Sequence, residues 1–452
     1  MVSANRSKFI HTACLAAAIF SFLGAATYQN SWVQANETVL YDFGPPNSGP
    51  APQGPLVMDA SGNLYGTTQG GGEYEQGAVF ELSPGSNGEW VERNLYSFGG
   101  AKDGGLPYSG LVIDAQGNLY GTTVLGGNLG GVNCQVGGGC GTVFELSPIG
   151  DGSWQETVLY AFNGGRDGDG PQATVALDSR GNIYGTTVYG GTYGSYGYGT
   201  VFKLTPSANG WKETLIHVFS DGSDGGYPYG AVIVDNAGNV YGTAPGGGLP
   251  SCGCGVVLKF SQNPAGHWKE TVLHSFTGGR DGAYPQSALT MDNNGNLYGT
   301  TFGGGLANAC TPLGDGGCGV VFELSRVSSG WKESVLHAFA GTDGAEPSAG
   351  LALDAAGNLY GAADYGGLNK CQNYPYSGCG VVFELAPQAN GHWQEKVLHA
   401  FSDADDGGYP VSAPNFDSAG NLYGVTLAGG PQSGACPQGC GVAYEFSGVG
   451  DH

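Results

Sequence analysis

The sequence predicts an all-β protein, a seven-bladed β-propeller in which each blade is a four-stranded antiparallel sheet. Three observations predict this fold. The motif Asp-x-x-Gly-Asn-x-Tyr-Gly occurs seven times, each time starting seven residues after a proline. Each copy of the repeat, roughly 57 residues long, carries several short apolar stretches and no helical periodicity. The chain also starts with a fourth strand and ends with a third, which is the arrangement that a closed ring requires.

The second copy of the repeat shows how one unit would form its four strands. Leu111–Ile113 is a short apolar run, and Asp114–Asn118 follows it with residues that suit a tight turn. Leu119–Thr123 is the second strand and Thr142–Leu146 the third, on the far side of a glycine-rich loop. Trp154–Phe162 is the fourth strand, with Trp154, Val158, Tyr160 and Phe162 on one face at a period of two. Four short strands joined by tight turns are typical of a propeller blade.

The two ends of the chain predict how the ring closes. The last copy stops after its third strand, Val442–Phe446, while Glu37–Phe43 near the start matches the fourth strand of the second copy. We therefore expect the N-terminal strand to complete the last blade. An open solenoid would gain nothing from this permutation and would leave two unpaired strand edges. A parallel β-helix is the alternative architecture, but its coils are usually shorter and its ends are not permuted.

Residues 1–35 resemble a secretory signal peptide. Arg6 and Lys8 supply a basic start, and Ala13–Ala26 is an apolar run too short to span a bilayer. Val33-Gln34-Ala35 is a suitable cleavage site, and cutting there would leave residues 36–452 as a single propeller domain. A retained N-terminal membrane anchor is the alternative. We expect no membrane span in the mature chain.

The charge of the chain limits its partners. Without the two basic residues of the signal segment, 13 basic and 38 acidic residues remain, a formal charge of −25. This balance argues against nucleic-acid binding, which needs basic residues to neutralise phosphates. It favours solubility and attracts cations or basic partners. We expect a monomer.

Ten of the eleven cysteines form five close pairs, each in a loop between the second and third strands. The pairs are Cys134 with Cys140, Cys252 with Cys254, Cys310 with Cys318, Cys371 with Cys379, and Cys436 with Cys440. In an oxidising compartment we expect five disulfides that close these loops. A bond across Cys252-Gly253-Cys254 would be strained. A zinc site is a weaker interpretation, because no histidine accompanies the pairs at ligand spacing.

The consensus of the repeat resembles a known family. The elements Val-Leu-Tyr-x-Phe, Gly-Gly-x-Asp-Gly-x-x-Pro, Asp-x-x-Gly-Asn-Leu-Tyr-Gly-Thr-Thr and Gly-Thr-Val-Phe-Glu-Leu are similar to the GloVer-type (Gloeo/Verruco) tandem repeat of exported bacterial proteins, over residues 36–447. The resemblance implies export, often to the cell surface, and no particular activity. Family members often end in a sorting anchor, whereas this chain ends in Ser447–His452, so we expect a periplasmic or released protein.

Function is expected on the face that carries the loops between second and third strands, because almost all variation in repeat length falls there. The links between blades share this face, and six of them carry an Asp-Gly pair, with Ser48 in place of the aspartate in the first blade. The aspartates are Asp103, Asp167, Asp224, Asp281, Asp343 and Asp406. They are interpreted either as turn formers or as a cation or sugar site at the mouth of the channel. Two groups are dense enough to suggest calcium, although they lack the spacing of a calcium loop. These are Asp221 with Asp224, and Asp403 with Asp405 and Asp406. No other cofactor is indicated.

Tyrosines gather on the same face. Those that flank the blade prolines are Tyr108, Tyr227, Tyr229, Tyr284 and Tyr409, and two glycine-rich loops add Tyr189, Tyr193, Tyr196 and Tyr198, and Tyr365, Tyr374 and Tyr376. Exposed tyrosines beside Asp, Asn and Gln suit carbohydrate binding by stacking and hydrogen bonding. The alternative is that they only hold the loops together.

No catalytic motif is found, so catalytic residues are not assigned and a binding role is favoured over an enzyme. Four histidines, His217, His274, His337 and His399, replace the tyrosine of Val-Leu-Tyr-x-Phe and are interpreted as structural. The leading hypothesis is an exported propeller that binds glycan or another envelope component through its variable loops. A polysaccharide hydrolase or lyase with its site at the channel mouth, and a protein-interaction hub, are the alternatives. An enzyme would require acids or bases that are not repeated, such as Glu346 and Asp364.

Overall fold

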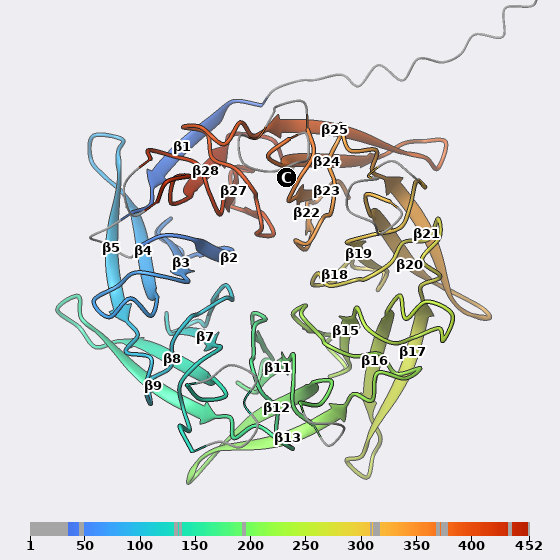
Figure 1. Cartoon of the computed structure of the whole chain (residues 1–452), viewed down its shortest axis with the longest axis horizontal. Coiled ribbons are helices and arrows are strands. Elements are labelled where there is room, and N and C mark those ends of the chain that lie inside the picture. The colour runs from blue at the N-terminus through green and yellow to red at the C-terminus, as the bar shows by residue number, and fades with distance from the viewer. Residues whose placement is uncertain are drawn as a thin grey trace, which may run out of the picture. The chain divides into compact units, whose positions relative to one another are not determined.

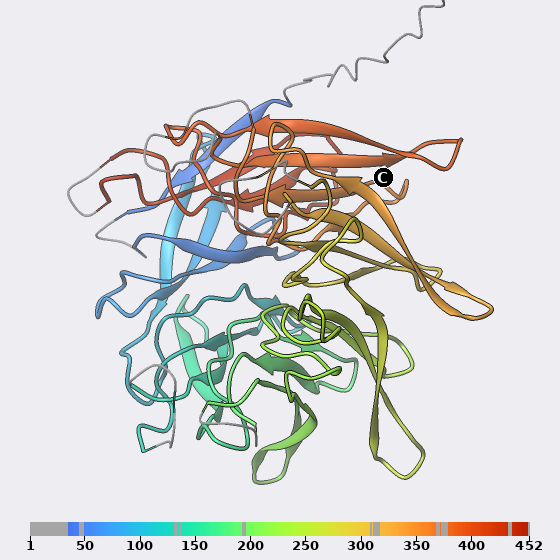
Figure 2. The same cartoon turned by 45° about the vertical axis from the view of Figure 1, so that its right-hand side comes forward.

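The structure is a computed structural model that describes residues 35–44, 49–130, 134, 138–191, 196–307, 310, 317–367, 371, 378–432 and 436–450. All of these residues belong to one unit, Trp32–His452. They form seven four-stranded antiparallel sheets that follow one another round a ring (Figures 1 and 2). The all-β seven-bladed propeller that the sequence predicts is therefore confirmed. The predicted signal peptide lies outside the described residues, apart from Ala35.

Six blades are continuous in the chain, and each runs from its innermost to its outermost strand (Figure 1). Blade 1 holds β2 (Pro52–Met58), β3 (Leu64–Thr68), β4 (Ala78–Pro84) and β5 (Trp90–Ser97). Blade 2 holds β6 (Val112–Ile113), β7 (Leu119–Thr123), β8 (Thr142–Pro148) and β9 (Trp154–Ala161). Blade 3 holds β10 (Ala176–Leu177), β11 (Ile183–Thr187), β12 (Thr200–Ser207) and β13 (Gly210–Val218).

The next three blades repeat this order. Blade 4 holds β14 (Ile233–Val234), β15 (Val240–Ala244), β16 (Val256–Gln262) and β17 (Trp268–Ser275). Blade 5 holds β18 (Thr290–Met291), β19 (Leu297–Thr301), β20 (Val320–Val327) and β21 (Gly330–Ala338). Blade 6 holds β22 (Ala352–Leu353), β23 (Leu359–Ala363), β24 (Val381–Pro387) and β25 (Trp393–Ala400). In blade 2, the third strand runs two residues longer than predicted and the fourth ends one residue earlier.

Blade 7 joins the two ends of the chain. It combines β26 (Asn415–Phe416), β27 (Leu422–Val425) and β28 (Val442–Phe446) with β1 (Glu37–Asp42). Strand β1 pairs antiparallel with β28, with Glu37 opposite Phe446 and Asp42 opposite Val442. Figure 1 shows this pairing as the blue first strand beside the red last strand. The predicted closure of the ring by the N-terminal strand is confirmed.

The repeated Asp-x-x-Gly-Asn-x-Tyr motif forms a hydrogen-bonded turn between the first and second strands of each blade. In blade 2, Asp114 Oδ1 accepts the backbone N–H groups of Gln116 and Asn118 at 2.8 and 2.9 Å. Its Oδ2 accepts the Asn118 side-chain amide at 2.9 Å and the Tyr120 hydroxyl at 3.0 Å. Gly117 supplies the positive φ of 85° that the turn needs. The Asn and Tyr side-chain bonds recur at Asp59, Asp178, Asp235, Asp292, Asp354 and Asp417.

The hydrophobic core lies between neighbouring blades. One cluster joins Phe98 of the link that follows blade 1 to Leu119 and Phe144 of blade 2, all almost fully buried. The rings of Phe98 and Phe144 meet edge to face at 5.0 Å between centroids. Gly121 is required beside Phe144, because a Cβ at Gly121 would lie 2.7 Å from the Phe144 ring. Each blade is thus stabilised by the next. Within the described residues, no helix is long and apolar enough to cross a membrane.

Candidate functional site

The links between blades and the loops between second and third strands share one face, as expected. Isolated antiparallel bridges join a link to such a loop, for example Gly226 to Gly246, Ala283 to Gly303 and Gly408 to Ala428. The residue before each blade proline lies at this contact with a positive φ, between 52° and 65°. These seven residues are Ala51, Leu106, Gly170, Tyr227, Tyr284, Glu346 and Tyr409. A strained backbone that recurs at every blade shows that the contact between neighbouring blades fixes it.

The ten paired cysteines form five disulfides, as the spacing predicts, with Cα separations of 5.0 to 5.3 Å. The bonds join Cys134 to Cys140, Cys252 to Cys254, Cys310 to Cys318, Cys371 to Cys379, and Cys436 to Cys440. Cys310 and Cys318 are both buried, in the core cluster between blades 5 and 6. That pair therefore packs against the core as well as closing its loop.

The second cysteine of each pair also contacts the next blade through its backbone. Its carbonyl accepts the N–H of the residue before the next blade's proline. Examples are Tyr284 to Cys254 at 2.9 Å, Glu346 to Cys318 at 2.9 Å and Tyr409 to Cys379 at 2.7 Å. Blades 1 and 3 have no cysteines and use Gln76 and Tyr198 as the acceptors. The disulfide loops therefore support the edge against which the following blade packs.

A cleft of about 470 Å³ opens on this face beside blade 4. Its lining comes from the link before β14, with Asp221 and Tyr227, and from the loop after β15, with Leu249 and Pro250. The rest of the lining is mainly glycine, so few side chains narrow the cleft. Asp221 and Tyr227 both have a φ of 57°. Burial, and then the neighbouring Asp224, raise the pKa of Asp221.

Two tyrosines of blade 3 pack against Tyr227, which lines the cleft. The ring of Tyr227 meets Tyr198 at 5.4 Å and Tyr189 at 6.1 Å, both edge to face. Burial and Tyr189 raise the pKa of Tyr229 to about 12, although 38% of Tyr229 is exposed. The structure thus brings together four of the tyrosines that the sequence singles out. Tyr193, Tyr374 and Tyr376 lie outside the described residues.

The other predicted tyrosines lie elsewhere. Tyr409 is almost fully buried, and its ring meets Tyr365 at 5.6 Å. Tyr284 is half-buried against the core between blades 4 and 5. The hydroxyl of Tyr108 accepts a hydrogen bond from Gln69. Tyr284 and Tyr409 therefore occupy the same repeat position as Tyr227 without lining its cleft.

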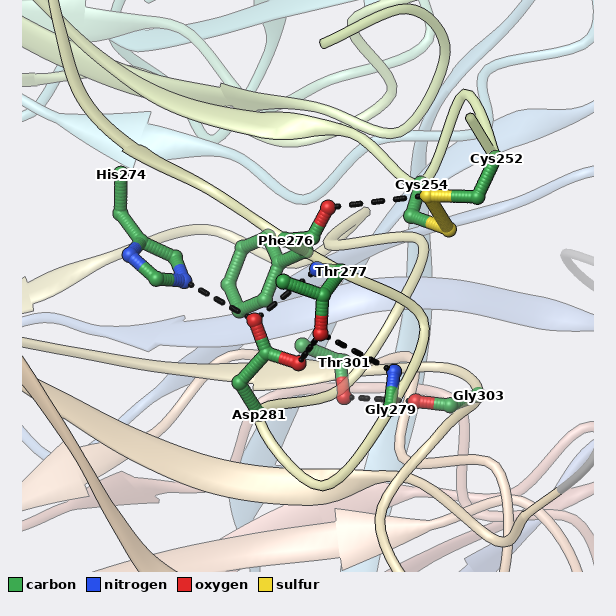
Figure 3. A network of polar contacts seen from close by, with 9 residues as sticks. All are labelled: Cys252, Cys254, His274, Phe276, Thr277, Gly279, Asp281, Thr301 and Gly303. Carbon is green, nitrogen blue, oxygen red and sulfur yellow. Dashed lines mark hydrogen bonds and ion pairs between the residues drawn. A yellow bond between two sulfur atoms is a disulfide. The ribbon is translucent and has the colours of Figure 1, made fainter. Parts of the chain in front are cut away.

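The six link aspartates bond within their own links, to the end of the preceding outer strand. Figure 3 shows the case of Asp281, whose Oδ2 lies 3.4 Å from His274 Nε2 and accepts the Thr277 N–H at 2.9 Å. Asp103 and Asp167 accept the hydroxyls of Tyr96 and Tyr160 in the same way, both at 3.1 Å. Asp224, Asp343 and Asp406 lie 3.1 to 3.2 Å from His217, His337 and His399. These contacts support the interpretation as turn and link residues.

Each of the two groups proposed for calcium contains carboxyls whose pKa values are shifted in opposite directions. Burial opposes ionisation of Asp224, but hydrogen bonds from His217 and Ser220 lower its pKa to about 2. Burial also opposes ionisation of Asp406, but hydrogen bonds to its carboxylate outweigh burial and lower its pKa. Asp403 has the same place in blade 7 as Asp221 in blade 4, and burial followed by Asp406 raises its pKa. Each group thus contains one strongly ionised carboxylate and one that is costly to ionise.

The three aspartates of the second calcium group do not converge on one point. Asp405 is exposed in the turn between Asp403 and Asp406. In the described part of the chain, the cluster of potential metal ligands that contains Asp406 is completed by Glu37 and His399, and it includes neither Asp403 nor Asp405. The reason is that the Asp406 carboxylate bonds toward the end of the preceding outer strand rather than toward Asp405. The structure therefore gives Asp405 no place in a calcium site with its two neighbours.

A glutamate from the following blade completes each of the link contacts, and the sequence analysis missed it. The glutamate stands in the outer strand and faces the link aspartate and the Tyr or His of the preceding blade. We call the three side chains a junction trio. The trios are Tyr96/Asp103/Glu156, Tyr160/Asp167/Glu213, His217/Asp224/Glu270, His274/Asp281/Glu333, His337/Asp343/Glu395 and His399/Asp406/Glu37. Burial raises the pKa of the glutamate to about 7 in four trios and to about 8 at Glu395.

One further carboxyl has no counterpart in the other blades. Asp364 follows β23, and its two oxygens lie 2.7 and 2.8 Å from the Ser348 hydroxyl, which donates its one proton to this carboxyl group. Burial raises the pKa of Asp364 to about 7 despite this hydrogen bond. Glu346, two residues before Ser348, is almost fully buried. A carboxyl that can exchange a proton near neutral pH is chemically suited to acid–base work.

Fold and site thus define a β-propeller with a clefted face of variable loops. The chain belongs to the Gloeobacter/Verrucomicrobia repeat family, whose model matches residues 25–133, 125–312 and 309–450. Among solved structures it is similar to a gluconolactonase from Xanthomonas campestris, at 14% sequence identity and a TM-score of 0.39. That match covers 74% of this chain and 87% of the gluconolactonase. No curated protein matches the sequence. We draw nothing about activity from a similarity at this level.

Proposed function

We propose that this protein is an exported carbohydrate-binding propeller, and that the cleft beside blade 4 holds the glycan. The carrying observation is the cleft itself, which an aromatic side chain, Tyr227, and a carboxylate, Asp221, line together with several glycines. Sugars bind to such surfaces because an aromatic ring stacks on their C–H faces while carboxylates and backbone groups bond their hydroxyls.

The surrounding structure supports a fixed binding surface. Tyr189 and Tyr198 hold the Tyr227 ring from blade 3, so little side-chain freedom remains to be lost when a ligand binds. Five disulfides suit an oxidising compartment, which agrees with the proposed export. An envelope or extracellular glycan is the ligand class that such a location offers.

The test is calorimetric titration of the protein with a panel of neutral and acidic oligosaccharides. Tyr227→Ala should weaken the binding of a hit about tenfold, which corresponds to about 1.4 kcal/mol. Tyr284→Ala is the matched control, because Tyr284 has the same repeat position and a φ of 59° but lies outside the cleft. Equal losses in the two variants would contradict the assignment of the cleft. If no oligosaccharide binds, a protein-interaction hub becomes the better proposal.

A polysaccharide-active enzyme is the second candidate, and Asp364 is the observation that favours it. This carboxyl is not repeated, and its pKa of about 7 would let it donate or accept a proton. Any oligosaccharide that binds should therefore be assayed for cleavage, with Asp364→Asn as the variant. Turnover that survives this substitution unchanged would exclude Asp364 from the chemistry.

A further inference from the structure

The junction between blades 6 and 7 is where the ring closes, and three potential ligands meet there. His399 is near the end of β25, Asp406 is in the link, and Glu37 is the first residue of β1. His399 Nε2 lies 3.2 Å from Asp406 Oδ2 and 3.3 Å from Glu37 Oε2. Only 4% of the His399 side chain and 11% of the Glu37 side chain are exposed. Two carboxylates thus converge on one buried imidazole nitrogen.

When Glu37 is ionised, the charges of this group do not balance within the protein. A single Nε2–H can serve one carboxylate well but not two, and the second negative charge is then costly in a buried place. Glu37 Oε1 and His399 Nδ1 are buried and have no hydrogen-bond partner in the described part of the chain. The salt bridges that Lys and Arg make among the described residues join Arg93 to Glu81 and Lys396 to Glu384, and neither includes Glu37 or Asp406.

A fourth polar group sets this junction apart from the others. Tyr444 in β28 occupies the place that Phe80, Phe144 and Phe383 have in their blades. Its side chain is fully buried, and its hydroxyl has no hydrogen-bond partner among the described residues. Burial and the nearby Glu37 carboxylate raise the pKa of Tyr444. Of the four junctions whose trio holds an imidazole and two carboxylates, this is the one with a tyrosine hydroxyl at that position.

We propose that the side chains of Glu37, His399 and Asp406 bind one Zn²⁺ ion that fastens the closing strand to blade 6. A divalent ion balances the two carboxylates and uses the Nε2 lone pair. Zn²⁺ takes N and O ligands at about 2.0–2.2 Å, so two ligands of a tetrahedral site stand about 3.4 Å apart. The N···O separations of 3.2 and 3.3 Å fit the edges of that tetrahedron. Calcium fits less well, because it prefers six to eight oxygen ligands.

The other junctions provide a series of comparisons. At His217 the second carboxylate, Glu270, is 3.9 Å from Nε2. The trio His337/Asp343/Glu395 has its ligand atoms within 4.8 Å of one another, as the closing trio does, but blade 6 has Phe383 where blade 7 has Tyr444. Three blades carry tyrosine in place of the histidine, at Tyr41, Tyr96 and Tyr160. The blade structure therefore accommodates tyrosine at this position, so His399→Tyr removes the nitrogen ligand with little risk to the fold.

The test uses the full chain, stripped of metal with a chelator and titrated with Zn²⁺ by calorimetry. In the wild type we expect saturable binding and a melting temperature that rises with Zn²⁺. In His399→Tyr we expect one Zn²⁺ equivalent fewer and no rise in the melting temperature. His274→Tyr, at the junction between blades 4 and 5, is the matched control and should keep that equivalent. Co²⁺ added in place of Zn²⁺ should give the visible absorption of a tetrahedral site in the wild type and not in His399→Tyr.

Glu37→Gln is a second variant, which tests the same ligand set if His399→Tyr proves unstable. It should also lose one Zn²⁺ equivalent. The proposal is overturned if the wild type binds no Zn²⁺ saturably, or if His399→Tyr and Glu37→Gln both keep every equivalent. It is also overturned if His274→Tyr loses the same equivalent, because the binding would then not belong to the closing junction. None of these outcomes depends on glycan binding, so this proposal and the proposed function fail separately.

Discussion

Replacing Glu156 by glutamine should make the stability of the protein less sensitive to pH. Glu156 stands on β9 and faces Asp103 and Tyr96 of the preceding junction. Its Oε1 is buried with no hydrogen-bond partner in the described part of the chain. Burial, and then the negative charge of Asp103, raise the pKa of Glu156 from 4.5 to about 7. Glutamine has the same shape as protonated glutamate and carries no charge.

The size of the effect follows from this shift. The folded state holds the Glu156 proton more tightly than the unfolded chain, so the contribution to stability is complete below about pH 4.5 and is lost as the pH rises through about 7. Each pKa unit is worth about 1.4 kcal/mol, which sets a ceiling of about 3 kcal/mol. Water reaches part of this carboxyl, so we expect about 1–2 kcal/mol.

The assay is urea unfolding of wild type and Glu156→Gln at several pH values from 4.5 to 8.5. The free energy of unfolding of the variant, relative to wild type, should increase by about 1–2 kcal/mol between the two ends of this range. Glu89→Gln, in an exposed turn, is the control and should show no such trend. A difference between wild type and Glu156→Gln that stays constant with pH, or that grows toward acid, would refute the reasoning.

Three further perturbations test the frame. Asp114→Ala removes the acceptor of four hydrogen bonds and should lower the free energy of unfolding by about 2–3 kcal/mol. A loss below about 0.5 kcal/mol, measured by urea unfolding, would contradict the role of this turn. Gly121→Ala places a methyl group 2.7 Å from the Phe144 ring and should cost about 1–3 kcal/mol, whereas an unchanged melting temperature would show that the ring can move aside. Deleting residues 35–44 leaves the edge of β28 unpaired, and size-exclusion chromatography should then show aggregates or exchanged strands rather than a monomer.

The parts of the fold that the sequence predicts are those that depend on neighbours in the chain. The turn at Asp114 could be foreseen because Asp, Gly, Asn and Tyr act within seven residues of one another. The closure of the ring could be foreseen because Glu37–Phe43 repeats the pattern of a strand that is missing at the other end. In both cases the evidence is local spacing or a direct match between repeats.

The candidate site was less predictable because its parts come from different blades. Tyr227 belongs to the link before blade 4, while Tyr189 and Tyr198, which support it, belong to a loop of blade 3. The role of the junction glutamates could not be predicted from the sequence for a similar reason. Glu156 looks like one polar residue in an alternating strand, and only the packing of blade 2 on blade 1 places it beside Asp103. The signal available in the sequence is the recurrence of that glutamate at the same position of every outer strand, Glu92 of β5 included.

Closeness in the chain was also misleading in one place. Asp403, Asp405 and Asp406 lie within four residues and suggested a shared cation, yet Asp405 is exposed while Asp406 bonds back to His399. In a tight turn, successive side chains point in different directions, so a dense run of carboxylates need not share one ligand. The cluster that Asp406 does join takes Glu37 from the far end of the chain, which spacing alone could not reveal.

Because β1 pairs with β28, the same fold could be built from a chain whose strands come in a different order. Glu37 stands opposite Phe446, so the two ends of the ring are already neighbours and a short peptide could join them. New ends could then be cut in an exposed turn between third and fourth strands, such as 149–153, without removing any strand pairing. Such a circular permutant would keep all seven sheets, but blade 2, rather than blade 7, would then be the blade built from both ends of the chain. In the natural order β1 must wait for β28 before its blade can form, and in the permutant β9 would wait for β8 in the same way.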